Sequence, residues 1–189
     1  VQIMSVHRSK GLEFPVVILA DLQKSFNRQD LSRPVLVHPE LGLGTERVDG
    51  ARHIRYDTIS KTALALRLDR EAKAEEMRIL YVAMTRAKEK LILLDCRKHM
   101  DRKLRDLTAL TGSPVMPEAV AAAGSPGEWL LLSLLHTDGA AALHALAGIR
   151  PEVLTPLPES WTIRLWREGG QETQAQPLPA AEEREVRPY

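Results

Sequence analysis

Two short segments of the chain combine residue types that suit phosphate chemistry. The first places a single arginine, Arg86, after Thr85, near the end of a long helix-favouring stretch that leads into an apolar run at 91–94. A helix end beside a buried strand can hold a guanidinium at a fixed angle, and this planar, permanently charged group binds phosphate through paired N–H donors. The alternative is an ordinary surface arginine, because charged helix ends are usually solvated.

The second segment lies at the start of the chain. It predicts a strand at Val1–Val6, a polar loop, and a second, more apolar strand at Pro15–Ala20. Gly11 lies at the centre of the loop, where it permits close backbone approach to a ligand. Polar donors surround this glycine at His7, Ser9 and Lys10. No Gly-x-x-x-x-Gly-Lys-Ser/Thr pattern precedes Lys10, so the loop is not a Walker-type phosphate loop.

The two segments, in this order, resemble the fifth and sixth motifs of superfamily 1 DNA helicases of the UvrD/Rep/PcrA type. The surrounding sequence is most similar to AddA, the helicase-nuclease subunit of bacterial AddAB complexes. This similarity includes an insertion between the motifs at 34–56 and a tryptophan-containing helix at 125–135. The resemblance implies an α/β fold of the RecA-like, P-loop NTPase type, a mostly parallel sheet flanked by helices, incomplete here as part of a second motor domain.

The resemblance also implies nucleotide contacts. Arg86 takes the place of the catalytic arginine that reaches ATP held by the first motor domain and stabilises charge on the γ-phosphate oxygens. Gly11 takes a position beside the γ-phosphate, and Glu13 a position at the ribose hydroxyls, where a carboxylate can accept two hydrogen bonds. From local sequence alone, Glu13 could equally form a salt bridge.

DNA contacts follow from the same loop. Ser5 and His7 take positions that meet single-stranded DNA in the resembling helicases, and Lys10 is a further candidate. An imidazole can donate to a phosphate or stack on a base. His7 could instead be a hydrogen-bonded loop histidine with no ligand.

The remaining pattern predicts the elements that position these residues. Turn residues at 39–42 favour a hairpin between 35–38 and 44–48. Residues 59–88 predict one long helix or two abutting helices, and a strand follows at 91–95. Within the helix, an apolar stripe at helical spacing predicts a core-facing side, formed by Met77, Leu80, Tyr81, Met84 and Ala87. Glu76 and Arg78 are read as ion-pair positions, or as an ordinary solvated face.

Later segments predict a mainly helical extension. Helices are expected at 101–110, at 129–135 after a Ser125 N-cap, and at 140–146 before Gly148. Alternating residues at Trp161–Trp166 predict a half-buried strand.

Composition bounds the class of protein. Of 189 residues, 44% are hydrophobic and 27% are charged, as in ordinary soluble domains. No apolar run approaches the roughly 20 residues of a membrane helix, and no signal peptide is apparent, so we expect a cytoplasmic protein without a membrane partner. Cys96 is expected to pack as a small hydrophobe at a strand end, and the scattered histidines suggest no metal site.

Charge is distributed unevenly along the chain. Residues 1–106 hold 21 Lys and Arg against 15 Asp and Glu, whereas residues 107–189 hold 5 against 10. A basic first part fits a polyanion surface, although basic faces are often merely solvated. The expected domains are a partial second motor domain at 1–106, a helical and strand extension towards a nuclease linker at 107–168, and a linker or disordered tail at 169–189.

The expected function is that of a fragment of an ATP-dependent DNA helicase-nuclease, which couples ATP hydrolysis to translocation and unwinding in double-strand break repair and recombination. ATP and Mg²⁺ are expected mostly on the first motor domain of the full-length protein, whose exonuclease lies in a further domain. The fragment alone is expected to hold no cofactor and to lack ATPase activity, because the phosphate loop and the acidic magnesium ligands are missing.

Expected partners are single- and double-stranded DNA, the first motor domain of the same chain and an AddB-type subunit. The alternative is a stand-alone nucleic-acid or protein-interaction module derived from a helicase fold. A structural domain with accidental motif matches is a third interpretation.

Overall fold

A computed structural model describes residues 1–110, 114–150, 154–158 and 160–166. The chain forms two compact units. The first contains Val1–Cys96 and Ala121–Gly127, and the second contains Arg97–Val120 and the described residues after Gly127. The predicted tail at 169–189 lies outside the described residues.

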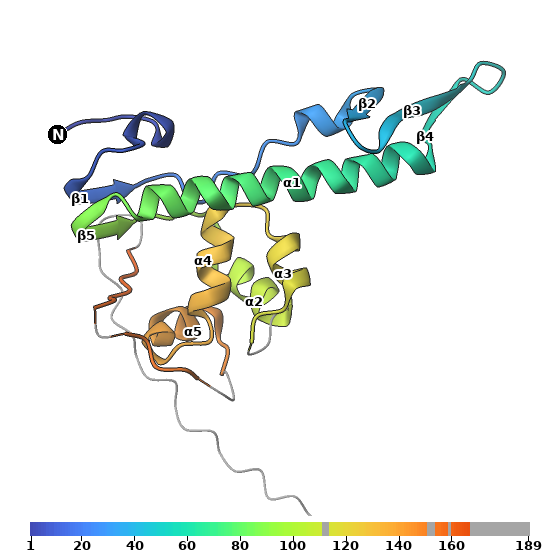
Figure 1. The fold of residues 1–189 in the computed structure, drawn as a ribbon. Coiled ribbons are helices and arrows are strands. Elements are labelled where there is room, and N and C mark those ends of the chain that lie inside the picture. Colours follow the sequence, from blue (N-terminus) through green and yellow to red (C-terminus); the bar gives the residue numbers. More distant parts are fainter. Residues whose placement is uncertain (111–113, 151–153, 159, 167–189) are drawn as a thin grey trace, which may run out of the picture. The chain divides into compact units, whose positions relative to one another are not determined.

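One long helix organises the first unit (Figure 1). Helix α1 spans Ile59–Met84 and begins after Thr58, whose side chain accepts a hydrogen bond from the Lys61 backbone N–H. Residues 51–111 contain neither Gly nor Pro, which favours an uninterrupted helix. The predicted long helix is confirmed, but it ends at Met84 rather than at residue 88.

A parallel pair of strands lies at the C-terminal end of α1 (Figure 1). Strand β1 (Phe14–Leu19) pairs with β5 (Ala87–Leu93), and Phe14 lies opposite Ala87. The predicted strand at 15–20 is confirmed. It was expected to be covered on both faces, but Val16 and Ile18 are 49% and 58% exposed. β5 begins four residues before its predicted start at residue 91, because pairing with β1 draws the polar residues after Arg86 into the strand.

A three-stranded antiparallel sheet packs on α1 near the N-terminal end of the helix (Figure 1). It consists of β2 (Val35–His38), β3 (Gly42–Asp49) and β4 (Ile54–Asp57), in the order β2-β3-β4. The predicted hairpin is confirmed, whereas β4 was not predicted. The described strands therefore form an α/β arrangement with one parallel pair, not a mostly parallel sheet, since short turns join β2, β3 and β4 and impose antiparallel pairing.

Close backbone approach and buried charge fix this sheet on α1. A Cβ atom at Gly44 would lie 2.6 Å from the Cα atom of Lys61, so only glycine fits there. The Lys61 side chain is 3% exposed, and its Nζ donates to Glu46 and Asp57 at 2.8 Å each. These hydrogen bonds, Asp57 first and Glu46 second, raise the pKa of Lys61. Strands β3 and β4 are thus both tied to the first turn of α1.

The β2–β3 turn is held by His38, which is 4% exposed. Its Nδ1 accepts hydrogen bonds from the backbone N–H groups of Glu40 and Leu41 at 3.1 and 3.2 Å. Its Nε2 lies 3.2 Å from a carboxylate oxygen of Glu71 on α1. Because Nδ1 accepts, the proton of the neutral ring is on Nε2 and points to Glu71.

Three sequence predictions in the first unit are wrong. Val1–Val6 is not a strand: residues 1–5 are irregular and Val6–Ser9 forms a 3₁₀ turn, because the local bond from Arg8 N to Ser5 O closes it. Cys96 is exposed. The predicted apolar stripe of α1 is not a core face, since Met77 and Tyr81 are 40% and 69% exposed. The helix instead buries the side that carries Leu64 and Ala83.

Four helices are described in the rest of the chain: α2 (Met100–Leu110), α3 (Pro117–Ala122), α4 (Pro126–Leu134) and α5 (Ala141–Ala147). All but α3 confirm predicted helices. Buried leucines form the core of the second unit, namely Leu104, Leu107, Leu131, Leu132, Leu135 and Leu143. Gly148 ends α5 with a positive φ of 67°, as a helix C-cap favours.

Two 3₁₀ turns, η2 (Gln29–Ser32) and η3 (Asp138–Ala140), complete the described elements. The predicted strand at Trp161–Trp166 is wrong, because residues 161–165 are irregular and Trp166 forms only an isolated bridge. An alternating pattern makes a strand only where a partner strand extends beside it. None of the described helices is long and apolar enough to cross a membrane.

Candidate functional site

The loop before β1 is a 3₁₀ turn followed by a β-turn. The hydroxyl of Ser9 is buried and donates to the carbonyl of Val6 at 2.7 Å. The backbone N–H of Leu12 then donates to the carbonyl of Ser9 at 3.0 Å. Lys10 has φ −58° and ψ 124°, and Gly11 has φ +82°. These are type II turn angles, which require glycine or asparagine at the third position. The conformation of the turn therefore explains Gly11.

Arg86 is fixed between α1 and β5. Its Nε donates to the carbonyl of Val82 at 3.0 Å, and its Nη2 donates to the hydroxyl of Thr85 at 3.2 Å. Its Nη1 donates to the carbonyl of Leu12, next to Gly11, at 3.2 Å. A guanidinium has five N–H groups. Within the described residues, three of these are used, and two remain for an anion.

A backbone bond joins the same two segments. The N–H of Phe14 donates to the carbonyl of Arg86 at 2.9 Å, at the start of the β1–β5 pairing. Arg86, Gly11 and Glu13 are thus brought together at one end of the parallel pair. A Cβ atom at Gly11 would meet nothing within 4 Å, so the turn faces open space.

Glu13 lies beside two cations. Its carboxylate is 2.9 Å from Nζ of Lys88, and both side chains are more than half exposed. The hydrogen bond from Lys88, the charge of Lys88 and the charge of Arg86 lower the pKa of Glu13, although partial burial opposes them. Glu13 therefore remains an ionised acceptor at neutral pH. A ribose hydroxyl at this position would share the carboxylate with Lys88.

The three DNA candidates lie on the same loop. Ser5, His7 and Lys10 are exposed. In the part of the chain that the structure describes, none of these side chains forms a hydrogen bond or an ion pair. All three are thus accessible to a ligand in solution.

Several contacts of the site were missed from the sequence. The partner of Glu13 is Lys88, two residues after Arg86, and the parallel β1–β5 register is the signal that could have identified it. Arg78 pairs with Glu75 at 2.9 Å, not with Glu76. Thr85 contacts Arg86 directly, whereas the exposed ring of Tyr81 does not contribute a core contact.

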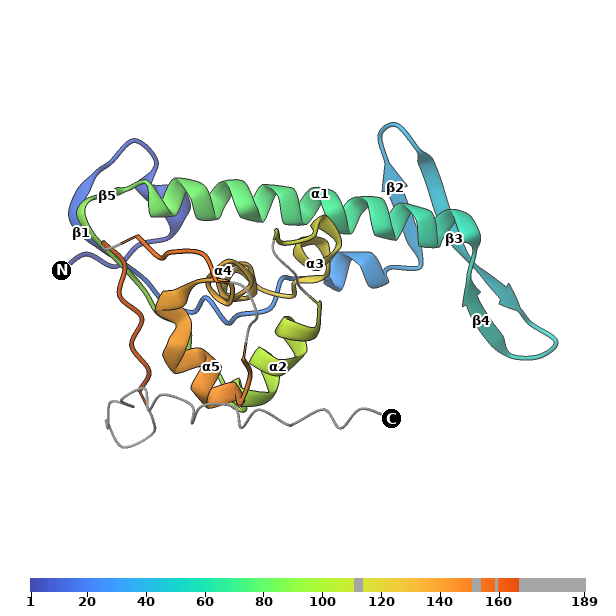
Figure 2. The same ribbon diagram turned by 90° about the horizontal axis from the view of Figure 1, so that it is seen from below.

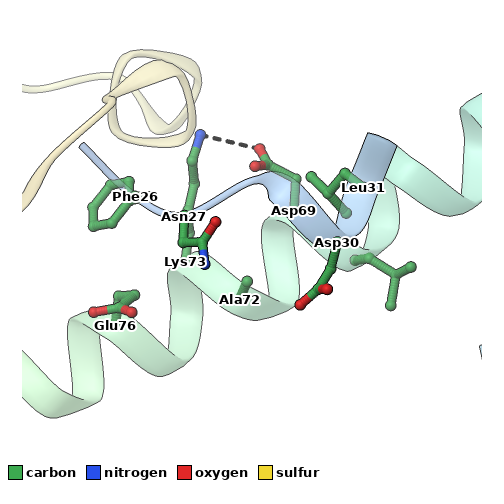
Figure 3. A pocket seen from close by; sticks show the side chains of 9 residues that line it. Phe26, Asn27, Asp30, Leu31, Asp69, Ala72, Lys73 and Glu76 are labelled. Atoms are coloured by element: carbon green, nitrogen blue, oxygen red, sulfur yellow. Dashed lines mark ion pairs between the residues drawn. The ribbon is translucent and has the colours of Figure 1, made fainter. Parts of the chain in front are cut away.

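A cavity of about 240 Å³ lies elsewhere in the first unit (Figure 3). Its lining includes Phe26, Asp30 and Glu76, and an ion pair of 3.1 Å joins Lys73 to Asp69 at its wall. None of the predicted site residues lines it. Within the described ranges, no group of three or more His, Cys, Asp and Glu side chains could hold a metal ion.

Comparison with known proteins identifies the family. Residues 1–98 match the family model of the UvrD-like helicase C-terminal domain. The chain belongs to the UvrD-like helicase family. Both segments of the site, the loop at 5–13 and Arg86, lie inside the matched region.

Relatives of this UvrD-like chain carry a common name, the A-type subunit of an ATP-dependent helicase/nuclease. The one from Moorella thermoacetica is 45% identical over 172 residues, which cover 89% of this chain and 12% of that protein. The one from Heliobacterium modesticaldum is 46% identical over 170 residues, 89% of this chain and 11% of that protein. The one from Bacillus cytotoxicus is 39% identical over 189 residues, 98% of this chain and 15% of that protein. The predicted similarity to AddA-type subunits is confirmed, and the chain spans less than a sixth of the length of these relatives.

Proposed function

We propose that this chain is a segment of the second motor domain of an AddA-type ATP-dependent helicase/nuclease. Arg86 is the catalytic arginine that completes an ATP site formed mainly by a first motor domain. In this role its guanidinium stabilises the charge that develops on the γ-phosphate oxygens during hydrolysis. The full-length protein couples hydrolysis to movement along DNA and to unwinding during double-strand break repair and recombination, in the cytoplasm and with an AddB-type partner.

The observation that carries this proposal is the bond between Arg86 Nη1 and the Leu12 carbonyl. It places the arginine next to the Gly11 turn, so one nucleotide can contact both. The two remaining N–H groups of Arg86, the open space at Gly11 and the ionised carboxylate of Glu13 suit phosphate oxygens and ribose hydroxyls. ATP fits this set of groups, and Mg²⁺ belongs with the first motor domain in this proposal.

The same loop supplies the DNA contacts. Ser5, His7 and Lys10 are exposed on the segment that leads into the Gly11 turn. A change at the nucleotide would therefore move the DNA-binding side chains with it, because both belong to one short segment. Residues 1–106 form the motor part in this proposal, and 107–168 extend it towards a nuclease linker. The segment by itself is expected to be inactive as an ATPase.

Replacing Arg86 tests the proposal. In the full-length protein, Arg86→Ala is expected to lower the kcat of DNA-stimulated ATP hydrolysis by on the order of 10³, the size typical of such arginines. The KM for ATP is expected to change much less, because the arginine acts mainly on the transition state. Steady-state ATPase assays with single-stranded DNA measure both quantities.

The matched control is Arg78→Ala, which removes an arginine from the same helix that pairs only with Glu75. It is expected to leave kcat nearly unchanged. Arg86→Lys keeps the charge but loses the fork, and is expected to recover little activity. ATPase activity of Arg86→Ala within a few-fold of the unsubstituted protein would contradict the assignment and favour a stand-alone binding module.

A further inference from the structure

The hairpin of β3 and β4 carries arginines that the rest of the fold does not neutralise. We call residues 47–56 the hairpin arm. Arg47, Arg52 and Arg55 are exposed. Arg52 lies 3.9 Å from Asp49 with its side chain 79% exposed, a pair that contributes little. Within the described residues, Arg47 and Arg55 form no ion pair.

The acidic residues of the same hairpin are all engaged internally. Glu46 and Asp57, which flank the arm, both accept from the buried Lys61. Asp49 accepts from the backbone N–H groups of Ala51 and Arg52 at 3.0 and 3.1 Å, which closes the turn. The exposed charge of the arm is therefore positive, and it attracts anions.

Strand register distributes the arginines over both faces of the arm. Arg47 lies directly opposite Tyr56, so these two side chains share one face. Arg55 lies opposite Val48, on the other face. A guanidinium beside an exposed aromatic ring suits a nucleic acid, because the guanidinium binds a phosphate while the ring stacks on a base.

The arm is also accessible. In both views the β3–β4 hairpin extends past the N-terminal end of α1, with its turn away from the helix (Figures 1 and 2). Tyr56 is 48% exposed. A two-stranded ribbon is narrow enough to enter the major groove of a duplex, and it can also lie along a single strand.

We propose that the hairpin arm binds the phosphodiester backbone of DNA through Arg47, Arg52 and Arg55. This contact is separate from the Ser5–Lys10 loop, which lies near the opposite end of α1 (Figure 1). The inference rests on the proposed function in one respect, which is that DNA is the polyanion present.

The test is the triple variant Arg47→Gln, Arg52→Gln, Arg55→Gln in the full-length protein, with DNA affinity measured without nucleotide at several salt concentrations. Each lost phosphate contact reduces the slope of log K against log salt by about 0.9 for duplex and about 0.7 for single strands. We expect the slope to fall by about 2 to 3 and the affinity at low salt to fall at least about tenfold.

A matched control removes three positive charges elsewhere: Lys24→Gln, Arg70→Gln and Arg102→Gln, all at exposed positions. This control is expected to keep the affinity within about twofold and to leave the slope nearly unchanged, since screened charges far from the DNA contribute little. Thermal unfolding of both variants checks that the glutamines leave the fold intact. An equal loss in the two variants would overturn the proposal, because only total charge would then matter.

Separate binding assays with single-stranded and duplex DNA identify which form the arm contacts. If single strands stack on the arm, Tyr56→Ala lowers single-strand affinity about fivefold or more, and Tyr56→Phe restores it. If the arm enters a duplex groove, the triple variant loses duplex affinity and Tyr56→Ala has little effect. Either result supports a phosphate contact.

Hydrogen exchange gives a second, local readout. DNA is expected to slow exchange of the backbone amides at 47–56 in the unsubstituted protein and not in the triple variant. Unchanged exchange at the arm, with unchanged affinity and salt slope in the triple variant, would overturn the inference. Failure of the motor proposal is distinguishable, because an active ATPase in Arg86→Ala does not affect nucleotide-free DNA binding by the arm.

Discussion

At the scale of single residues, the site depends on a glycine and an arginine whose surroundings differ. Arg86 is held by three acceptors, so its position is set by the folded chain before any ligand binds. Gly11 is required by its backbone angle alone, because a side chain there would have space. The arginine is therefore defined by contacts, and the glycine by conformation.

Gly11→Ala is expected to destabilise the chain by about 1 kcal/mol, because an L-residue with a Cβ atom is strained at positive φ. Gly11→Asn is expected to cost less, since asparagine tolerates this region. Urea unfolding of the chain measures both. Gly50→Ala is the control, because this turn glycine also has open space and does not have a positive φ. Equal effects at the two glycines would contradict the turn assignment.

Sequence reasoning identified the composition of the site better than its contacts. Gly11, Glu13 and Arg86 were predicted together from the motif resemblance, and the structure places them at one end of β1 and β5. Their roles stay predictions. The Glu13–Lys88 pair could not be predicted, because it depends on which strands pair and in which register.

At the scale of elements, the boundary between α1 and β5 shows how tertiary pairing overrides local preference. Residues 87–90 read Ala-Lys-Glu-Lys, which favours a helix, yet they belong to a strand. Pairing with the apolar β1 supplies the hydrogen bonds that make the strand preferable. The start of α1 was predictable, because its cap and composition are local. Its end was not.

The contact between β3 and α1 is the tightest described for this sheet, and it gives a prediction. Gly44→Ala is expected to cost about 2 to 3 kcal/mol, because the new Cβ atom would lie 2.6 Å from the Lys61 Cα atom and backbone cannot move aside easily. Urea unfolding of the chain measures this loss. The control is Thr45→Ala, at the adjacent exposed position of β3, which is expected to change stability by at most about 0.5 kcal/mol. Comparable losses in the two variants would refute close packing.

At the scale of the whole molecule, burial was the least predictable property. The 44% hydrophobic content indicates an ordinary core. In the structure, however, large apolar side chains such as Val16, Ile18, Leu66 and Tyr81 are between 49% and 69% exposed. A pattern of apolar residues shows which side chains favour burial. It does not show which neighbours are available to bury them.

The stability of the whole chain is expected to fall as the pH is lowered from about 6 to about 3. Hydrogen bonds from partner side chains lower the pKa values of Glu13, Glu71 and Asp101. At Asp69, burial raises the pKa, but the bonds and charges of Lys73 and Arg28 together lower it. A depressed pKa means that the stabilisation is present above the ordinary value, near 4, and is lost as acid protonates the carboxylate.

Asp69→Asn is expected to reduce stability at neutral pH and to make its dependence on acid shallower, because one of these carboxylates no longer titrates. Urea midpoints measured across this pH range provide the test. The control is Asp30→Asn, at a side chain that is 78% exposed and paired only with the nearby Arg33. An acid dependence of Asp69→Asn that matches that of the unsubstituted chain would contradict the role of the Arg28 and Lys73 contacts.

The length of α1 sets a distance between the two regions proposed to meet DNA. With 26 residues and a rise of about 1.5 Å per residue, the helix is about 39 Å long. The hairpin lies near its first turn and the Arg86 region at its last (Figure 1). One turn of B-form DNA measures about 34 to 36 Å. A straight oligonucleotide that occupied both regions at once would therefore need to be longer than one helical repeat, and shorter fragments could fill only one of them.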